Sequence, residues 1–197
     1  MKKIAVTGGL SSGKSTVCLF LKDLGAYVVS ADAIVHQLLS SDEVISQKVT
    51  HLLGPRILIE DRIDRKKIAK IVFSDPVKLK ALEKILHPAV EKEIVRQYEQ
   101  VKNNSSYIFF AAEIPLLYET GMEKLFDRII AVNTDTQVAL SRYETSTGLT
   151  KKDFDARMSY QKKPLKADFV IVNNGDLADL KKNIVSIVQQ LKEYLSE

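Results

Sequence analysis

Nine residues near the start of the chain have the spacing G-x-x-x-x-G-K-[ST]: Gly8-Gly9-Leu10-Ser11-Ser12-Gly13-Lys14-Ser15-Thr16. Glycines in such a loop let main-chain N–H groups converge on phosphate oxygens at the N-terminus of the next helix. The Lys14 ammonium would reach the β- and γ-phosphates, the Ser15 hydroxyl is the expected Mg²⁺ ligand, and Thr16 would add a phosphate contact. We therefore expect a nucleoside triphosphate with Mg²⁺ to bind at Gly8, Gly9, Ser11, Ser12, Gly13, Lys14, Ser15 and Thr16.

Three classes of protein use this loop: small-molecule kinases, GTP-dependent switches, and motor or nucleic-acid ATPases. A GTPase needs a base-reading N-K-x-D motif, and the nearest segment, residues 173–176, reads Asn-Asn-Gly-Asp without the lysine. Motor ATPases are generally longer and carry a hydrophobic strand that ends in Asp-Glu, whereas the apolar run 107–112 is followed by the single carboxylate Glu113. The sequence favours a kinase with a small acceptor, and a nucleotide-dependent switch protein is the alternative from another class.

A kinase of this kind needs a carboxylate that orients the acceptor hydroxyl and takes its proton. Asp32 follows the apolar run 26–30, and ligands of open α/β sheets bind outside the carboxyl ends of the strands. Asp32 is therefore a candidate catalytic base. It is equally a candidate N-cap for a helix over residues 33–39, because aspartate is a favoured capping residue. Position alone does not separate the two interpretations.

The hydrophobic pattern predicts the elements that position these residues. Short runs that are apolar on both faces predict parallel strands at residues 3–7, 26–30, 107–112, 128–132 and 168–172. Helical patterns follow at residues 14–24, 33–39, 136–145 and 177–195. This alternation predicts the three-layer α/β fold of P-loop NTPases with a five-stranded parallel sheet.

Two insertions interrupt the alternation. Residues 40–104 look wholly helical, with helices at 65–73 and 77–86 and a new helix starting at Pro88. Residues 148–166 are polar and contain five lysines, which suits either a mobile lid or plain surface helices. We expect a single P-loop kinase domain over residues 1–197, with a core of about 1–39 and 105–197, a helical acceptor-binding insertion of about 40–104, and a short lid of about 142–166.

The composition is that of an ordinary globular protein: 197 residues, 45% of them hydrophobic and 27% charged. A single cysteine excludes an internal disulfide framework and fits a reducing cytoplasm. No apolar run approaches the ~20 residues needed to span a bilayer, and the first run breaks at Gly8, too early for a signal peptide. The net charge of +4 suits anionic ligands but is mild for a nucleic-acid binder. We expect a cytoplasmic protein, favoured as a monomer, without nucleic-acid or membrane partners.

Several further motifs resemble the dephospho-coenzyme A kinase family. Ser30-Ala31-Asp32 resembles the Asp-Ala-Asp segment of that family, and residues 115–119 resemble its Pro-Leu-Leu segment. The phosphate loop and the segments 64–68, 72–76, 86–88, 157–161 and 167–175 match in type, spacing and order. Together they cover about half the chain. The resemblance departs at two positions, because Ser30 replaces the first Asp of the family segment and Ser146 stands where a second lid arginine often occurs.

The resemblance implies ATP-dependent phosphorylation of the ribose 3′-hydroxyl of dephospho-coenzyme A, the last step of coenzyme A synthesis. A nucleoside monophosphate kinase or another small-metabolite kinase is the alternative within the same class. Asp32 would be the catalytic base, and Lys14 and Arg142 would stabilise the transferring phosphoryl group. The resemblance further places Asn173 and Gly175 beside the ATP adenine.

Four residues are expected at the acceptor, and each has a simpler alternative. Arg65 would grip acceptor phosphates with its guanidinium, or else pair with Asp64 or Glu60 on the surface. His87 would line the acceptor pocket, or else be a helix-start histidine satisfied by local backbone. Leu116 and Tyr118 would form an apolar wall for the acceptor, or else be part of the core.

Overall fold

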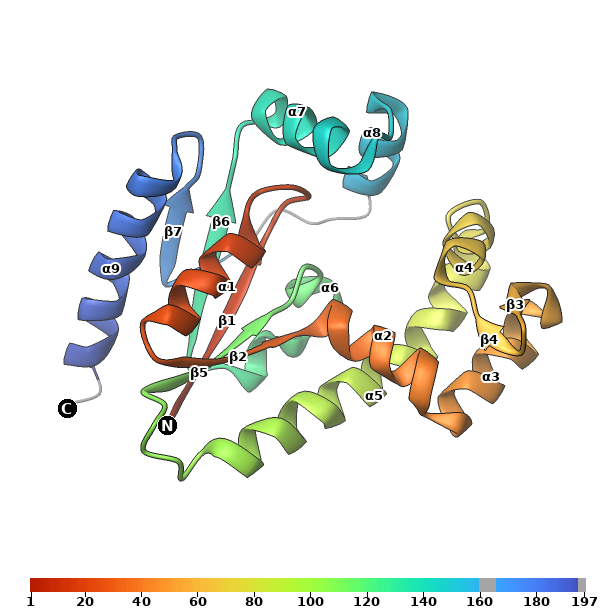
Figure 1. Cartoon of the computed structure of the whole chain (residues 1–197), viewed down its shortest axis with the longest axis horizontal. Helices are drawn as coiled ribbons and strands as arrows, with labels where there is room; N and C mark the ends of the chain where they lie inside the picture. The colour runs from red at the N-terminus through yellow and green to blue at the C-terminus, as the bar shows by residue number, and fades with distance from the viewer. Residues whose placement is uncertain (160–165, 195–197) are drawn as a thin grey trace. The chain divides into compact units, whose positions relative to one another are not determined.

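The computed structural model describes residues 1–159 and 166–194 and is drawn in Figure 1. The chain divides into two compact units. The first comprises Met1–Ser30 and Tyr98–Glu197, and the second comprises Ala31–Gln97. No helix among the described residues is long and apolar enough to cross a membrane.

A five-stranded sheet of order β2-β5-β1-β6-β7 forms the centre of the first unit. Every pairing in it is parallel, as expected for runs that are apolar on both faces. The strand predicted at residues 107–112 is β5, which begins two residues later, at Phe109, and ends one residue later, on Glu113. The strands are β1 (Lys2–Gly8), β2 (Ala26–Ser30), β5 (Phe109–Glu113), β6 (Arg128–Asn133) and β7 (Phe169–Val172).

Helices cover both faces of this sheet, which confirms the predicted three-layer α/β fold. On one face α1 (Lys14–Asp23) and α9 (Leu177–Glu193) contact each other and bury Val17, Leu21 and Ile184 against Ile4. On the other face Tyr98, near the end of α5 (Pro76–Val101), meets the Phe110 ring edge-on, with centroids 5.5 Å apart. The remaining helices of this unit are α6 (Leu117–Thr120), α7 (Thr136–Thr147) and α8 (Lys151–Met158).

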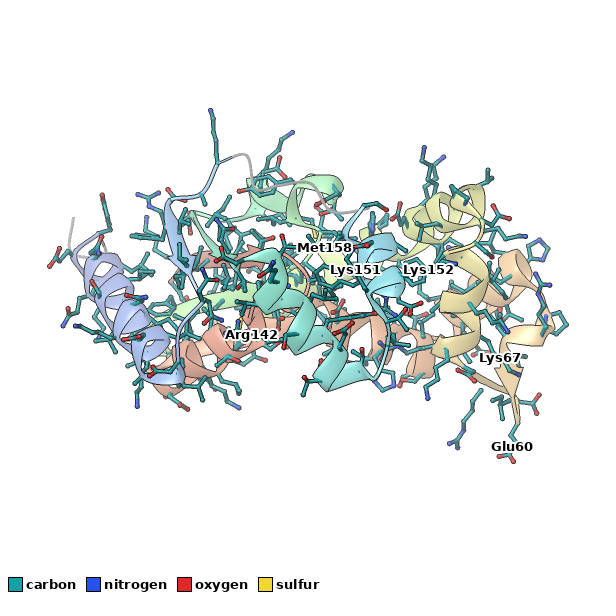
Figure 2. The ribbon with its side chains drawn as sticks, turned by 90° about the horizontal axis from the view of Figure 1, so that it is seen from above. Glu60, Lys67, Arg142, Lys151, Lys152 and Met158 are labelled. Carbon is teal, nitrogen blue, oxygen red and sulfur yellow. The ribbon has the colours of Figure 1, made fainter. Side chains whose placement is uncertain are left out.

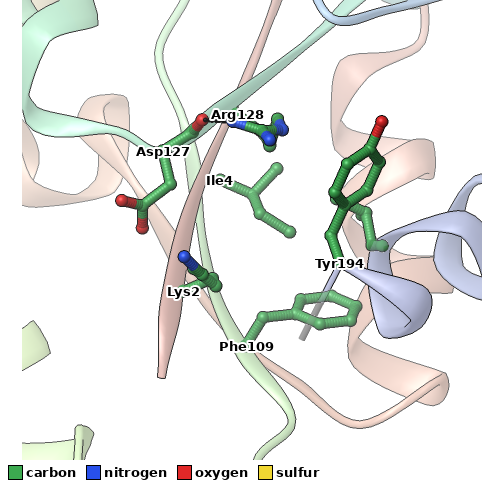
Figure 3. Close-up of a pocket in the computed structure, with 7 residues that line it drawn as sticks. Lys2, Ile4, Phe109, Asp127, Arg128 and Tyr194 are labelled. Atoms are coloured by element: carbon green, nitrogen blue, oxygen red, sulfur yellow. Dashed lines mark hydrogen bonds between the residues drawn. The ribbon is translucent and has the colours of Figure 1, made fainter. Parts of the chain in front are cut away.

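A small apolar notch lies at the amino ends of β1, β5 and β6 (Figure 3). Its volume is about 30 Å³, and the Arg128 guanidinium lies over the Tyr194 ring at its rim, 4.9 Å from the centroid. Such a notch holds one or two water molecules and no nucleotide. The glycine-rich loop, which follows β1, lies at the opposite, carboxyl edge of the sheet. The notch is lined by Lys2, Ile4, Phe109, Asp127, Arg128, Leu191 and Tyr194.

The second unit has its own core of aliphatic side chains, among them Val49, Ile57 and Leu82. Its elements are α2 (Ala31–Ser41), α3 (Glu43–Leu53), the 3-10 helix η1 (Pro55–Ile57), β3 (Leu58–Ile59), β4 (Arg62–Ile63), α4 (Arg65–Val72) and most of α5.

The expectation of a wholly helical segment is wrong at the hairpin β3–β4, where Leu58 pairs with Ile63. Its turn residues Glu60 and Asp61 have φ of 47° and 59°. A two-residue turn with positive φ usually contains Asn or Gly, and because neither is present here the sequence contains no sign of the hairpin. The Lys67 ammonium, labelled in Figure 2, donates to the Leu58 carbonyl at 2.9 Å and ties α4 to the hairpin.

The new helix start predicted at Pro88 is also wrong, because α5 continues through that proline. A proline inside a helix costs about 3 kcal/mol, since it removes one hydrogen bond and crowds the preceding turn. Leu82, Leu86, Val90 and Ile94 are buried at four-residue spacing on both sides of Pro88. Each buried aliphatic side chain contributes about 1.5–3 kcal/mol, which outweighs the cost of the proline.

Candidate active site

The glycine-rich loop connects β1 to α1, and close packing dictates two of its glycines. A Cβ at Gly8 would lie 2.1 Å from the Val132 carbonyl oxygen. A Cβ at Gly13, where φ is 95°, would lie 2.3 Å from the Asn173 side-chain nitrogen. Neither neighbour belongs to the loop, so the loop shape depends on β6 and on the residue that follows β7.

The Lys14 side chain folds over this loop and is only 8% exposed. Its ammonium donates to the carbonyl oxygens of Gly8 at 3.1 Å and Gly9 at 2.8 Å. These two acceptors offset the cost of burying a charge and keep the cation at the loop. Lys14 therefore stands where the sequence motif predicts a phosphate-binding cation.

Ser15 and Glu113 form an oxygen pair beside the loop. The Ser15 hydroxyl donates to Glu113 Oε1 at 2.8 Å, and Glu113 stands opposite Val6 of β1 in the sheet register. Hydroxyl and carboxylate oxygens are ligands that suit Mg²⁺, which in phosphate sites takes one or two protein ligands and fills the rest with water and phosphate. No group of three or more His, Cys, Asp or Glu side chains in the described part of the chain could hold a metal alone.

Two clefts open at this edge of the first unit. One, of about 380 Å³, is bordered by the phosphate loop and by two cationic side chains, and it is lined by Ser11, Ser12, Gly13, Lys14, Ser15, Thr16, Arg142 and Ser146. The other, of about 680 Å³, has an apolar wall and is lined by Gly13, Thr16, Arg142, Asn173, Gly175, Asp176, Leu177, Ala178 and Leu180. Arg142 borders both clefts, as do Gly13 and Thr16. The first cleft suits an anion, and the second suits a flat, partly apolar group.

Arg142 extends from α7 and docks on the residue that follows β7. Its guanidinium donates to the main-chain oxygen of Asn173 at 3.0 Å. Gly175 sits tightly against α9, since a Cβ there would lie 3.1 Å from Asp179 Oδ2. Figure 2 shows Arg142 on α7 and Lys151 and Lys152 on α8. The structure thus brings Arg142, Asn173 and Gly175 to the phosphate loop, which the predicted roles of these residues require.

The helices α7 and α8 share a small core of their own. The rings of Tyr143 and Phe154 meet edge-on with centroids 5.5 Å apart, and both side chains are fully buried. Leu10 of the phosphate loop packs against this core together with Met158. The loop and these two helices therefore share a hydrophobic contact. Residues 160–165 of the predicted lid, with Tyr160 and Gln161 of the matched segment 157–161, lie outside the described residues.

Among the predicted acceptor residues, Leu116 and Tyr118 belong to the first unit. Leu116 immediately precedes α6, and the Tyr118 hydroxyl donates to the Lys166 carbonyl oxygen. Partial burial, with smaller contributions from the charges of Glu123 and Asp168, raises the pKa of Tyr118. Tyr118 therefore keeps its proton at neutral pH and serves as a hydrogen-bonding group.

Asp32, Arg65 and His87 belong to the second unit, and three simpler interpretations of them are wrong. The helix α2 begins at Ala31, so Asp32 lies in its first turn and does not cap a helix starting at residue 33. His87 lies inside α5 instead of at a helix start. The ion pairs of the described residues include none between Arg65 and either Asp64 or Glu60. Asp64 instead caps α4 by accepting from the Lys66 N–H at 2.7 Å.

Sequence reasoning did not assign Glu113 to this site, nor Asp176, Leu177, Ala178 and Leu180 of the wide cleft. The sequence presents Glu113 only as the single carboxylate after an apolar run. It becomes a site residue because β5 lies next to β1 although the two strands are far apart along the chain. A carboxylate that ends a predicted strand near a phosphate loop is the signal that could have found it.

A family model described as dephospho-CoA kinase matches residues 2–179. The chain belongs to the dephospho-CoA kinase family. It is 49% identical over 200 residues to the dephospho-CoA kinase of Protochlamydia amoebophila, covering 99% of this chain and 98% of that protein. It is 40% identical to the enzyme of Chlamydia trachomatis serovar D, covering 96% of both chains.

Solved structures agree with the assignment to the dephospho-CoA kinase family. The dephospho-CoA kinase from Campylobacter jejuni superposes with a TM-score of 0.69 at 30% identity, covering 97% of both chains. A protein from Thermus thermophilus superposes with a TM-score of 0.78 at 30% identity, covering 96% of this chain and 97% of that one. The family resemblance inferred from the sequence motifs is thereby confirmed.

Proposed function

We propose that this chain transfers the γ-phosphoryl group of ATP to the ribose 3′-hydroxyl of dephospho-coenzyme A. One observation carries the proposal: an anion cleft with a lysine, an arginine and the Ser15 hydroxyl, which is hydrogen-bonded to the Glu113 carboxylate, adjoins a wider cleft with an apolar wall. This arrangement suits a nucleoside triphosphate, and membership of the family indicates the acceptor.

The triphosphate would lie in the anion cleft. The loop N–H groups and the N-terminus of α1 would bind its oxygens, and Lys14 would neutralise charge on the β- and γ-phosphates. The buried Ser12 hydroxyl has no hydrogen-bond partner among the described residues and is a further donor for a phosphate oxygen. Arg142, which borders both clefts, would balance the charge that grows on the transferring group.

Ser15 and Glu113 would hold Mg²⁺, because the pair offers a hydroxyl and a carboxylate oxygen 2.8 Å apart. When bound, the ion supplies positive charge that neutralises the phosphate oxygens. Glu113 also accepts the hydrogen bond of the Ser15 hydroxyl, which leaves a lone pair of the hydroxyl oxygen available to a cation. The adenine would occupy the wide cleft between Arg142, Asn173 and Gly175.

For the acceptor, we assign Asp32 as the base. Its carboxylate would take the proton of the 3′-hydroxyl as that oxygen bonds to the γ-phosphorus, and the bond from this phosphorus to the β,γ-bridging oxygen breaks. The products are ADP and coenzyme A. Arg65 would bind the acceptor phosphates, His87 would line the pocket, and Leu116 and Tyr118 would form its apolar wall.

We also propose the wider setting of this activity: a cytoplasmic monomer with one P-loop kinase domain and no nucleic-acid or membrane partner. Residues about 40–104 would be the acceptor-binding insertion and residues about 142–166 the lid. Light scattering at working concentration tests the monomer, since a mass near twice 22.1 kDa would contradict it.

An acceptor panel tests the function. ADP release is measured with ATP and Mg²⁺ against dephospho-coenzyme A, AMP, CMP, nucleosides, shikimate and gluconate, and the product is checked by mass. We expect kcat/KM for dephospho-coenzyme A to exceed every other acceptor by at least ~10²-fold, about 2.7 kcal/mol. A preference for AMP or CMP would indicate a nucleoside monophosphate kinase. Equal ATP turnover without an acceptor would indicate a switch protein.

A further inference from the structure

The peptide between Ser12 and Gly13 is held from outside the phosphate loop. Two donors share the Ser12 carbonyl oxygen: the Thr134 hydroxyl at 3.1 Å and the Asn173 side-chain amide at 2.8 Å. Thr134 directly follows β6 and Asn173 directly follows β7. The two donors therefore come from neighbouring strand ends of the same sheet.

Fixing this carbonyl also fixes the next N–H group. The peptide is trans, and in a planar trans peptide the C=O of Ser12 and the N–H of Gly13 point in opposite directions. Gly13 lines both clefts. Holding the Ser12 oxygen toward β6 and β7 thus orients the Gly13 N–H, one of the loop donors available to a phosphate.

The two donors are themselves well fixed. Asn173 is 6% exposed, and its main-chain N–H donates to the Asn133 carbonyl at 2.8 Å. The Thr134 hydroxyl also lies 3.2 Å from the Asn173 carbonyl oxygen, the same oxygen that accepts from Arg142. One short network therefore joins the loop, the ends of β6 and β7, and the lid arginine.

We propose that Thr134 is a positioning residue, which with Asn173 holds the Ser12–Gly13 peptide in its anion-binding orientation and thereby sets affinity for the nucleotide phosphates. The proposal rests on the proposed nucleotide-dependent function of this site. Thr134 touches neither cleft and acts through the loop. A loop contact formed equally before and during transfer changes KM for ATP more than kcat, because it stabilises ground and transition states alike.

The test compares Thr134→Val, which keeps the shape and removes the donor, with Thr134→Ser, which keeps the donor. Calorimetry measures ADP binding, and steady-state kinetics separate KM for ATP from kcat. We expect Thr134→Val to weaken ADP binding and to raise KM for ATP about 5- to 10-fold, the effect of one lost hydrogen bond, with kcat within about twofold. Thr134→Ser should stay within about twofold of the wild type.

Thr120→Val is the matched control, because the Thr120 hydroxyl likewise donates to two main-chain carbonyls, those of Leu116, which precedes α6, and of Leu117, its first residue. It should leave ADP affinity unchanged. Asn173→Asp is the second variant in case Thr134→Val does not fold. Its carboxylate would face the Ser12 carbonyl without a proton to donate, and ADP affinity should fall at least about 10-fold.

The positioning role would be overturned by unchanged ADP affinity in both Thr134→Val and Asn173→Asp, or by a loss of kcat with KM for ATP unchanged. A Thr134→Ser variant as weak as Thr134→Val would also overturn it. Failure of the proposed function is a separate result, since wild-type chain that binds no ADP would show it without any acceptor or variant.

Discussion

At the scale of single residues, the first question is what the Asp32 carboxylate does. Because α2 begins at Ala31, Asp32 is placed in the first turn, where a negative charge near the helix N-terminus stabilises by about 0.3–1 kcal/mol. Asp32→Asn removes this charge and the proton-accepting capacity. We expect kcat to fall at least ~10²-fold, within the range of general-base catalysis, while ADP affinity is retained.

Asp32→Asn needs a fold control. Its melting temperature should drop by only a few degrees, as a loss below ~1 kcal/mol implies. Activity close to wild type in Asp32→Asn would leave the reaction without an assigned base.

Arg142 gives the second prediction at this scale. It borders both clefts and donates to the Asn173 carbonyl, so its guanidinium lies beside the proposed phosphate site. We expect Arg142→Ala to lower kcat at least ~10²-fold, about 2.7 kcal/mol of barrier, and Arg142→Lys to recover only part of it. Ser146 lines the same anion cleft, so Ser146→Arg should partly restore kcat to Arg142→Ala.

Steady-state kinetics with both substrates saturating measure this effect of Arg142, and titration with a non-hydrolysable ATP analogue measures binding. A loss confined to ATP affinity, with kcat intact, would make Arg142 a clamp on the adenine side.

At the scale of elements, the hairpin β3–β4 carries strain at its turn. Glu60 and Asp61 both have positive φ, which costs a residue with a Cβ about 1–2 kcal/mol. The double variant Glu60→Asn with Asp61→Gly supplies the residues this turn favours. We expect the free energy of unfolding to rise by ~1 kcal/mol in urea titrations.

The variant Asp61→Ala tests whether the rise in the free energy of unfolding comes from relieved backbone strain or from the removed charge. It removes the charge and keeps the Cβ, so it should not stabilise. If Asp61→Ala stabilises as much as the double variant, the gain comes from relieving charge repulsion instead of backbone strain.

The elements also show what sequence alone can predict. The strands β1, β2, β6 and β7 were predictable within about two residues because a strand buried on both faces must be apolar throughout. The hairpin β3–β4 could not be predicted, because its strands are only two residues long and its turn contains neither Asn nor Gly. The helix start predicted at Pro88 was wrong because the burial of side chains on both sides of Pro88 outweighs the free-energy cost of a proline inside a helix.

At the scale of the whole molecule, the phosphate loop was predictable because its motif is local, whereas its support was not. Glu113, Thr134 and Asn173 reach the loop only through the strand order β5-β1-β6-β7, which places segments far apart in the sequence side by side. No spacing along the chain predicts the contacts of Glu113 and Thr134, whereas the family resemblance places Asn173 at the nucleotide without predicting its bond to the loop. The candidate site is therefore coupled to the integrity of the sheet that assembles it.

Cys18 allows this coupling to be measured. It lies in α1 with 4% of its surface exposed, packed in the core between α1, α9 and the sheet. Burial raises the pKa of its thiol well above the ordinary range, and the Glu113 charge adds to the rise against a smaller opposing effect of Lys14. Since only the thiolate reacts, the folded chain should not react with a thiol reagent at pH 8. Labelling must then proceed through opening of the sheet.

Nucleotide binding should slow this labelling. A ligand at 100 times its Kd that binds only the folded chain stabilises it by ~2.7 kcal/mol, so ADP at that concentration should slow labelling about 100-fold. The unfolded thiol has the lower pKa, so raising the pH above about 8.5 favours the open chain and should speed labelling. The labelling rate in urea gives the reference for a free thiol. Labelling of the folded chain at that reference rate, or at a rate indifferent to ADP, would show that Cys18 reacts without opening the sheet that holds the site.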